Sequence, residues 1–413
     1  MSPRRPVQRG IAAVVALAFA IAGCGGAPIL ANAPILFPAP PTASPGPSTP
    51  ADPIPITWPR DDGPHDRLTE WWYYTGHLRA DDGRTFGFEA VVFRAERGAV
   101  PVAWASHVAV TDESGDRFYY AQRSEIGPQV DRSPLDQTGT PTGFDLEVGG
   151  LSPALIANGA PAVAAPWRLQ GANGTDRIEA TLTPAEVAAA GAPFGFMLDL
   201  HTLKPPVAHQ GNGFIDFGPA GSSYYYSRTR LSASGVLQLR GETLHVTGIA
   251  WFDHQWGNFV SVGAGGWNWF AINLDDGTDI TLSTVLDEHA AATLQYGTLV
   301  KPSGEVVNLA DGTNYSVSSG GRTWFSPSTG VTYPADWFIN LIGSNGVPQR
   351  VLYLAPTVGD QELDARATTG VAYWEGSETV TDVTSEIYGG GKAETPVVGK
   401  AYVEITRYDA PGG

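Results

Sequence analysis

Glycine and proline are so frequent that they limit what this chain can fold into. The 413 residues include 50 Gly and 33 Pro, and both residue types destabilise helix interiors. Between them lie short runs of alternating apolar side chains, bounded by dipeptides such as Asp82-Gly83 and Asp276-Gly277. Such dipeptides supply the positive φ angles that tight hairpins need. We therefore predict a mostly β protein whose one short helix lies at Thr183–Ala190.

An internal repeat predicts that the chain contains two related units. The aromatic segment Trp71–Tyr74 is followed by the turn Asp81–Gly83, and Trp267–Phe270 is followed in the same way by Asp275–Gly277. Closing each antiparallel sheet into a barrel would remove exposed strand edges. We predict an all-β fold of two tandem antiparallel barrels, and a single large sandwich is the alternative. The predicted units span residues 61–220 and 221–410.

The first residues have the features of an export signal. Three arginines precede the apolar stretch Ile11–Ala22, which is too short to span a bilayer comfortably. The end of this stretch, Ile21–Cys24, resembles a bacterial lipobox, in which the signal is cut before the cysteine and that cysteine, here Cys24, is lipidated. An ordinary signal peptide that contains a cysteine is the alternative. We predict a lipoprotein signal peptide at residues 1–23 and a membrane-anchored protein of the cell envelope, outside the cytoplasm.

A proline-rich segment follows the predicted lipidation site. Residues 24–60 combine Pro with Ala, Ser and Thr, a composition that favours an extended chain and buries too little apolar surface to fold. We predict that this segment is a tether between the membrane and the folded units.

Charge, cysteine content and missing motifs exclude several classes of function. The formal net charge is −17, which argues against nucleic acid as a partner. The single cysteine excludes disulfides within the chain and zinc sites made of cysteines. The sequence has no P-loop, no G-x-S-x-G elbow, no H-E-x-x-H motif and no Rossmann fingerprint. We predict no cofactor and no metal site.

The segment Leu244–Trp256 carries the strongest candidates for chemistry. Strand alternation places His254 and Trp256 on one face of this strand and Trp251 and Asp253 on the other, unless a bulge changes their direction. An imidazole beside an indole can exchange protons where the indole stabilises a cationic intermediate. The alternative is a structural histidine within a tryptophan-rich core.

Other candidates are one further histidine and two carboxyl groups next to aromatic residues. His107 shares a strand face with small alanines, which leave room for a ligand or allow close packing. Glu70 precedes Trp71 and Trp72, and Glu375 follows Trp374. A carboxyl group held against an indole can have a raised pKa and act as an acid. Each glutamate can instead be a solvent-facing residue of an amphipathic strand.

The remaining histidines carry less signal. His209 lies in a glycine-rich loop, where it is either a lid residue or simply exposed. We assign the others to structural or exposed positions; they are His65, His77, His201, His245 and His289.

A series of motifs resembles the AttH-like and carotenoid 1,2-hydratase (hydroxyneurosporene synthase) family, in the family's order and over about residues 60–408. The motifs are Glu70–Leu78, Phe86–Phe88, Phe93–Arg94, Ser106–Ala109, Lys204–His209, Ser223–Ser227, Trp251–Gly257, Gly266–Trp269, Leu274–Gly277 and Tyr373–Gly376. The resemblance implies two tandem lipocalin-like (calycin) barrels and an apolar, polyene or isoprenoid-like substrate in an aromatic cavity. The family's hydratases add water to a terminal C=C bond, and the resemblance gives His254 and Trp256 a part in that reaction. Ser283 and Val285 stand where those hydratases have Tyr and Asp, which argues against carotene hydration itself.

These observations lead to one main hypothesis and two alternatives. We predict acid–base chemistry on an apolar unsaturated small molecule, either hydration or isomerisation. Asp253 or Glu375 would donate the proton, and His254 would orient or deprotonate water. The predicted ligand-binding residues are Trp256, Trp251, Trp267, Trp269, His107, Glu70 and Trp72. The alternatives are a non-catalytic carrier of a hydrophobic ligand and a secreted hydrolase.

Overall fold

The structure is a computed structural model that describes residues 52–149, 166–260, 265–389 and 395–407. The predicted signal peptide, the predicted lipidation site Cys24 and most of the predicted tether lie outside these residues. Within the described ranges, no helix combines the length and the apolar composition needed to cross a membrane.

The first sheet is antiparallel and runs from residue 69 to residue 258. Its strands follow the order β4-β3-β2-β1-β12-β11-β8-β7-β6-β5, and β9 and β10 pair with β11. The strands are β1 (Thr69–Ala80), β2 (Thr85–Arg97), β3 (Val100–Asp112), β4 (Arg117–Ile126), β5 (Phe144–Val148), β6 (Trp167–Ala172), β7 (Thr175–Thr181), β8 (Phe194–Thr202), β9 (Val207–Ala208), β10 (Phe214–Asp216), β11 (Ser222–Leu239) and β12 (Glu242–Asn258).

The second sheet is built in the same way from the rest of the chain. Its order is β16-β15-β14-β13-β24-β23-β21-β20-β17, with β22 beside β23, and β18 and β19 form a separate pair. The strands are β13 (Gly266–Leu274), β14 (Asp279–Leu286), β15 (Ala292–Val300), β16 (Val306–Leu309), β17 (Tyr315–Ser319), β18 (Thr323–Phe325), β19 (Thr332–Pro334), β20 (Trp337–Leu341), β21 (Arg350–Pro356), β22 (Glu362–Asp364), β23 (Ala372–Asp382) and β24 (Val397–Thr406).

Both sheets curl into barrels by the same pairing. In each unit the first strand pairs with the last, β1 with β12 and β13 with β24. Within the described residues, no ladder joins the fourth strand to the fifth, so each barrel is nearly closed rather than closed. The predicted hairpins are present, because β1 turns into β2 at Asp82-Gly83 and β13 turns into β14 at Asp276-Gly277. The predicted fold class of two tandem antiparallel barrels is confirmed.

Each barrel has its own apolar interior, because alternate side chains of every strand point inward. Trp72, Phe88 and Phe252 belong to the core of the first barrel, and Trp374 and Ile339 to the core of the second. Burying a side chain of this size stabilises the fold by about 1.5–3 kcal/mol relative to exposure.

Short helices connect the strands. The predicted helix is confirmed as α2 (Pro184–Ala190), whose N-cap Thr183 forms a capping box with Glu186. A second short helix, α3 (Thr384–Gly389), was not expected from the sequence. The 3₁₀ turns are η1 (Arg60–Asp62), η2 (Pro128–Val130), η3 (His209–Gly211) and η4 (Gly218–Ala220).

The boundaries of the units differ from the sequence-based ones. We placed the change of unit after residue 220, but β11 and β12 continue the first sheet, so the change falls between Asn258 and Gly266. The boundary is set by hydrogen bonding between strands that are far apart in the sequence. No local sequence pattern reveals this pairing. The end of the predicted tether also differs, because Ile56 packs against the first core and the ring of Trp58 contacts that of Tyr226.

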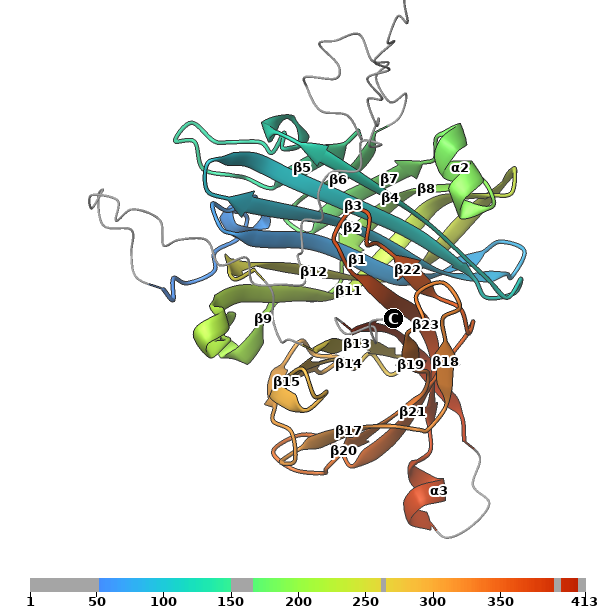
Figure 1. The fold of residues 1–413 in the computed structure, drawn as a ribbon. Coiled ribbons are helices and arrows are strands. Elements are labelled where there is room, and N and C mark those ends of the chain that lie inside the picture. The colour runs from blue at the N-terminus through green and yellow to red at the C-terminus, as the bar shows by residue number, and fades with distance from the viewer. Residues whose placement is uncertain (1–51, 150–165, 261–264, 390–394, 408–413) are drawn as a thin grey trace, which may run out of the picture.

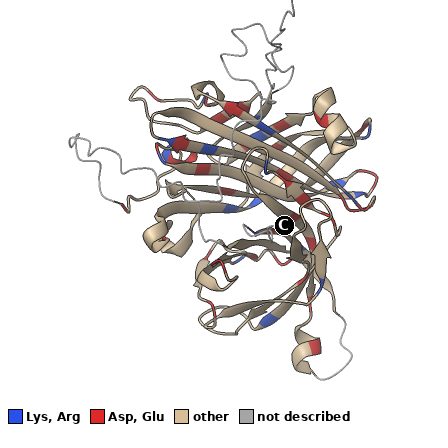
Figure 2. Cartoon of the chain, viewed as in Figure 1, with Lys and Arg blue, Asp and Glu red and all other residues tan. Residues whose placement is uncertain are grey.

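The two barrels pack side against side (Figure 1). The outward faces of β1, β2 and β12 meet those of β13 and β24 in a shared apolar cluster that includes Tyr73, Trp251, Trp269 and Tyr402. Gly87 allows this approach, since a Cβ at that position would lie 2.5 Å from the hydroxyl of Tyr402. Acidic and basic residues are interspersed along both barrels in the view of Figure 2.

Candidate active site between the two barrels

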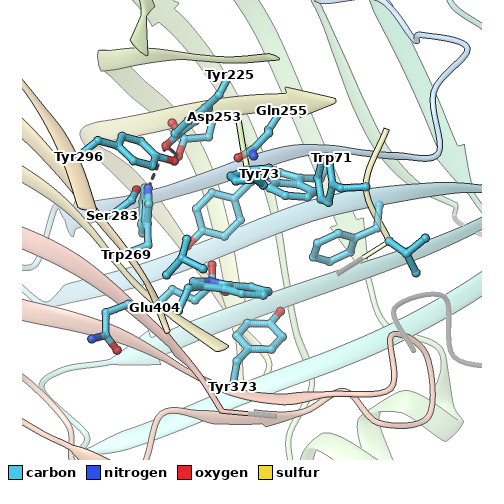
Figure 3. Close-up of a pocket in the computed structure, with 17 residues that line it drawn as sticks. Trp71, Tyr73, Tyr225, Asp253, Gln255, Trp269, Ser283, Tyr296, Tyr373 and Glu404 are labelled. Carbon is cyan, nitrogen blue, oxygen red and sulfur yellow. Dashed lines mark hydrogen bonds between the residues drawn. The ribbon is translucent and has the colours of Figure 1, made fainter. Parts of the chain in front are cut away.

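A pocket lies at the contact between the barrels (Figure 3). It encloses about 910 Å³ of space free of protein atoms, part of it open to solvent. Trp71 and Tyr73 of β1 and Asp253 and Gln255 of β12 line it from the first barrel. These residues share one face, because odd-numbered positions of both strands point out of the barrel.

The second barrel contributes the opposite wall. Trp267 and Trp269 come from β13, and Glu404 comes from the neighbouring strand β24. Ser283 and Val285 of β14 line the same pocket. The walls are mainly aromatic, so the pocket suits a flat or extended apolar ligand with a few polar groups near it.

Asp253 is buried in this pocket among hydrogen-bond donors. The hydroxyl of Tyr225 donates to its Oδ2 at 2.6 Å, and the indole Nε1 of Trp251 donates to its Oδ1 at 2.7 Å. The hydroxyl of Ser227 also donates to Oδ1. Trp269 donates to the oxygen of Tyr225 at 3.0 Å, so two indoles from different barrels converge on this group.

Burial raises the pKa of Asp253 to about 6, although its three hydrogen-bond donors act in the opposite direction. This value is close to neutrality, where a carboxyl group can both give and take a proton at useful rates. Asp253 is therefore suited to acid–base chemistry on whatever the pocket holds.

His209 lies behind Asp253 and connects the barrels. Its Nε2 is 2.7 Å from the hydroxyl of Ser227, and its Nδ1 is 3.0 Å from Thr298 of the second barrel. Burial lowers the pKa of His209 to about 3, so the ring is neutral near neutral pH. It is fully buried, which corrects the expectation of a lid or an exposed residue.

Glu404 is a second carboxyl group on the pocket wall. The indole of Trp267 donates to its Oε1 at 2.7 Å, and Thr406 donates to the same atom at 3.2 Å. Burial and the charge of Asp253 raise the pKa of Glu404 to about 7.

Two tyrosines of the pocket lead to further buried carboxyl groups. The hydroxyl of Tyr73 donates to Glu375, and that of Tyr373 donates to Glu89 at 3.0 Å. Burial raises the pKa of Glu89 to about 8, and burial together with Glu89 raises that of Glu375 well above its ordinary range. His107 Nδ1 lies 2.6 Å from the Tyr373 oxygen.

His254 lies on the other side of β12, inside the first barrel. Its ring stacks on that of Trp72 with centroids 4.6 Å apart, and the centroid of Trp256 is 4.7 Å away. Its Nε2 is 2.9 Å from Oε1 of Glu70. The sequence-based mechanism used His254 and Asp253 together, and the structure corrects this, because neighbouring residues of a regular strand face opposite sides.

Comparison with known proteins identifies the family of this chain. The family model described as AttH-like matches residues 49–408. The chain belongs to the AttH-like family. A comparison with proteins of curated function gives no significant match.

Solved structures share the fold of this AttH-like protein. An AttH protein (NE1406) from Nitrosomonas europaea is 27% identical, with a TM-score of 0.66 over 87% of this chain and 99% of its own. Kievitone hydratase from Nectria haematococca is 17% identical, with a TM-score of 0.60 over 86% of this chain and 93% of its own. CghA is 11% identical, with a TM-score of 0.52 over 84% of this chain and 90% of its own.

The predicted site residues of the AttH-like protein fall into two places. Asp253, Trp267 and Trp269 line the pocket between the barrels, and Trp251 bonds to Asp253. Glu375 and His107 do not line the pocket. They contact Tyr73 and Tyr373, respectively, which do. Four predicted residues lie inside the first barrel instead; they are His254, Trp256, Glu70 and Trp72.

The structure also adds residues that sequence reasoning did not select. Tyr225 and Ser227 stand in the motif Ser223–Ser227. They are two positions apart on one strand and therefore share a face, which was an available signal. Glu89 and Glu404 had none, because each occupies an ordinary strand position: Tyr373 of the second barrel donates to Glu89, and the charge of Asp253 in the first barrel raises the pKa of Glu404.

Proposed function

We propose that this AttH-like protein binds an apolar, unsaturated small molecule between its barrels and catalyses hydration or isomerisation with its own side chains as acid and base. The observation that carries the proposal is the pair of carboxyl groups, Asp253 and Glu404, set in one aromatic pocket with pKa values raised to about 6 and about 7. A hydratase among the proteins with the same fold supports this direction.

Hydrogen bonding separates the roles of the two carboxyl groups. Both oxygens of Asp253 accept hydrogen bonds, and its donors stabilise the ionised form. Glu404 accepts through Oε1, and no described residue donates to its Oε2, which is therefore able to carry a proton. Glu404 is thus the proton donor and Asp253 the acceptor, a change from the donor role that the sequence suggested for Asp253.

The reaction then proceeds in two steps. The Glu404 proton adds to one carbon of the C=C bond and leaves a cation on the other, which the faces of Trp267 and Trp269 stabilise. In hydration, water adds to the cation and loses its proton to Asp253. In isomerisation, Asp253 instead removes a proton from a carbon next to the cation. Proton transfer between the two carboxyl groups restores the starting state.

Isotope labelling distinguishes the two reactions. Small molecules that co-purify with the protein are identified by mass spectrometry and then incubated with it in H₂¹⁸O or in D₂O. We expect ¹⁸O in a hydrated product, or deuterium without added oxygen in an isomer. Asp253→Asn and Glu404→Gln are each expected to slow turnover by about 10²–10⁴-fold, whereas Ser283→Ala, which changes the same wall, keeps its rate within a few fold.

The main competing function is transport of the same ligand without chemistry. The mostly aromatic lining of the pocket favours it. A ligand that binds the wild type and both carboxyl variants equally, and that gains neither isotope, would establish a carrier.

A hydrolase is less well supported by the geometry. Ser227 is the hydroxyl that contacts both His209 and Asp253, but it is fully buried and does not line the pocket. Asp253 accepts a hydrogen bond from Ser227 and not from His209, so it does not orient the imidazole as a serine hydrolase requires.

The location of the protein is proposed from the sequence. The lipobox-like Ile21–Cys24 supports a lipid anchor at Cys24 that holds the protein in the cell envelope, outside the cytoplasm. Cys24→Ser is expected to move the protein from the membrane fraction to the soluble fraction of the cell envelope, and a variant that stays with the membrane contradicts the anchor.

A further inference from the structure

Three side chains converge at the end of the first barrel, away from the pocket between the barrels. Nδ1 of His65 lies 2.7 Å from Oε1 of Glu70, and Nε2 of His254 lies 2.9 Å from the same oxygen. The three atoms all lie within 4.8 Å of one another. His65 precedes β1, Glu70 is in β1 and His254 is in β12, so the cluster connects the N-terminal segment to two neighbouring strands.

The orientation of His254 requires a positive charge between its ring and Glu70. Its Nδ1 is 3.0 Å from the backbone oxygen of Asp61, which can only accept, so Nδ1 carries the hydrogen. In the neutral ring, Nε2 then presents a lone pair to the carboxylate oxygen. Two acceptors at this distance are held together by either a proton or a metal ion.

The surrounding hydrogen bonds match the outer shell of a metal site. The Nε2 of His65 lies 3.3 Å from the Asp61 carboxylate, so each imidazole has its far nitrogen next to an oxygen of the same residue. Metal-binding histidines are usually oriented in this way. The backbone N–H of His65 donates to Oε2 of Glu70 at 2.9 Å, which directs Oε1 towards the two rings.

We propose that His65, Glu70 and His254 bind a divalent metal ion of the zinc class. Two imidazole nitrogens and one carboxylate oxygen form a donor set that zinc uses in sites with an open fourth position. Bonds of about 2.0–2.1 Å place tetrahedral ligand atoms about 3.3 Å apart, so each imidazole nitrogen moves roughly half an ångström away from the Glu70 oxygen on binding. His65 is the ligand able to move, since it lies in a loop and its side chain is 18% exposed.

One of the three ligands, His65, lies on the wall of a separate cavity, whereas Glu70 and His254 are fully buried. Asp61, His65 and Trp256 help to line this cavity, which encloses about 700 Å³ including open solvent. Water or an external ligand in this cavity would reach the ion from the side of His65. The site shares no residue with the pocket proposed for catalysis.

Cobalt serves as the probe, because its visible absorption reports its coordination number and geometry. The full-length chain without an affinity tag is treated with a chelator, dialysed and titrated with Co²⁺, and then with Zn²⁺ as competitor. We expect one equivalent of Co²⁺ to bind saturably, Zn²⁺ to displace it, and Zn²⁺ to raise the melting temperature.

Variants assign the site to these residues. His65→Ala and Glu70→Gln are each expected to weaken Co²⁺ binding at least tenfold and to abolish the melting shift, and Glu70→Gln preserves the packing of a fully buried residue. His289→Ala removes an exposed histidine and is expected to bind as the wild type does. Absence of saturable binding in the wild type, or unchanged binding in both folded variants, overturns the metal site and assigns the cluster to a proton-linked triad.

Discussion

At the scale of single residues, the chemistry of the pocket depends on how Asp253 is surrounded. Burial raises its pKa, while Tyr225, Ser227 and Trp251 lower it by donating hydrogen bonds. The balance keeps the group near neutrality. Asp253 and His254 are neighbours in the sequence, and strand alternation places Asp253 in the pocket and His254 in the interior of the first barrel.

The contribution of Tyr225 can be measured without knowing the substrate. Tyr225→Phe removes a donor to the ionised carboxylate, so we expect the pKa of Asp253 to rise above about 6 by roughly one to two pH units. The titration is followed by the carboxyl ¹³C shift of labelled aspartate, which is assigned by its absence in Asp253→Asn.

Tyr296→Phe is the matched control for this titration, because Tyr296 lines the same pocket and is not among the donors to Asp253. Its midpoint is expected to equal that of the wild type. A midpoint in Tyr225→Phe that is unchanged or lower would contradict the assigned hydrogen bond.

At the scale of elements, the hairpins follow from local sequence and the sheets do not. Turn dipeptides set the β1–β2 and β13–β14 hairpins, and the N-cap threonine with its proline and glutamate sets α2. The pairing of β1 with β12 joins residues 166 or more positions apart, which no short motif encodes. This pairing is what moves β11 and β12 into the first barrel and shifts the boundary between the units.

The same long-range pairing creates the cluster that we propose as a metal site. Thr69 to Ala80 of β1 run antiparallel to Val246 to Gly257 of β12, which brings Glu70 beside Trp256 and near His254. His65 reaches them from a loop whose sequence has no metal-binding spacing. For this reason we predicted no metal site from the sequence and assigned His65 to a structural or exposed position.

At the scale of the whole molecule, the site exists because two barrels face each other. Glu89 comes from the first barrel, and Glu375 and Glu404 come from the second. The charge of Glu89 raises the pKa of Glu375 across the contact, and burial is the largest cause for all three. Their protonation is thus linked to the folding and docking of the barrels.

This linkage predicts that stability falls as pH rises. The pKa of Glu89 is about 8 in the folded protein, above the ordinary value near 4.5. Between these values the unfolded chain has lost the proton and the folded protein keeps it, so the free energy of unfolding decreases by about 1.4 kcal/mol per pH unit for one such group. The contribution is complete below about pH 4.5 and is lost above about pH 8.

Glu89→Gln tests the linkage, because the amide cannot ionise. We expect the variant to gain stability relative to the wild type as the pH rises from 5 to 8, measured by urea unfolding at several pH values. Glu242→Gln, which changes an exposed carboxyl group, is the control and should follow the wild type. An identical pH dependence in Glu89→Gln and wild type would show that Glu89 ionises normally in the folded protein.

The sequence by itself determined the all-β class, the repeated hairpins, the short helix α2 and the outward direction of Asp253, because turn geometry, capping and strand alternation act over a few residues. Only the tertiary structure decided which residues share a site. Glu404 and Asp253 are 151 positions apart and meet because the outer faces of two barrels pack together. The raised pKa values follow from the same event, since burial of these carboxyl groups depends on both barrels being present.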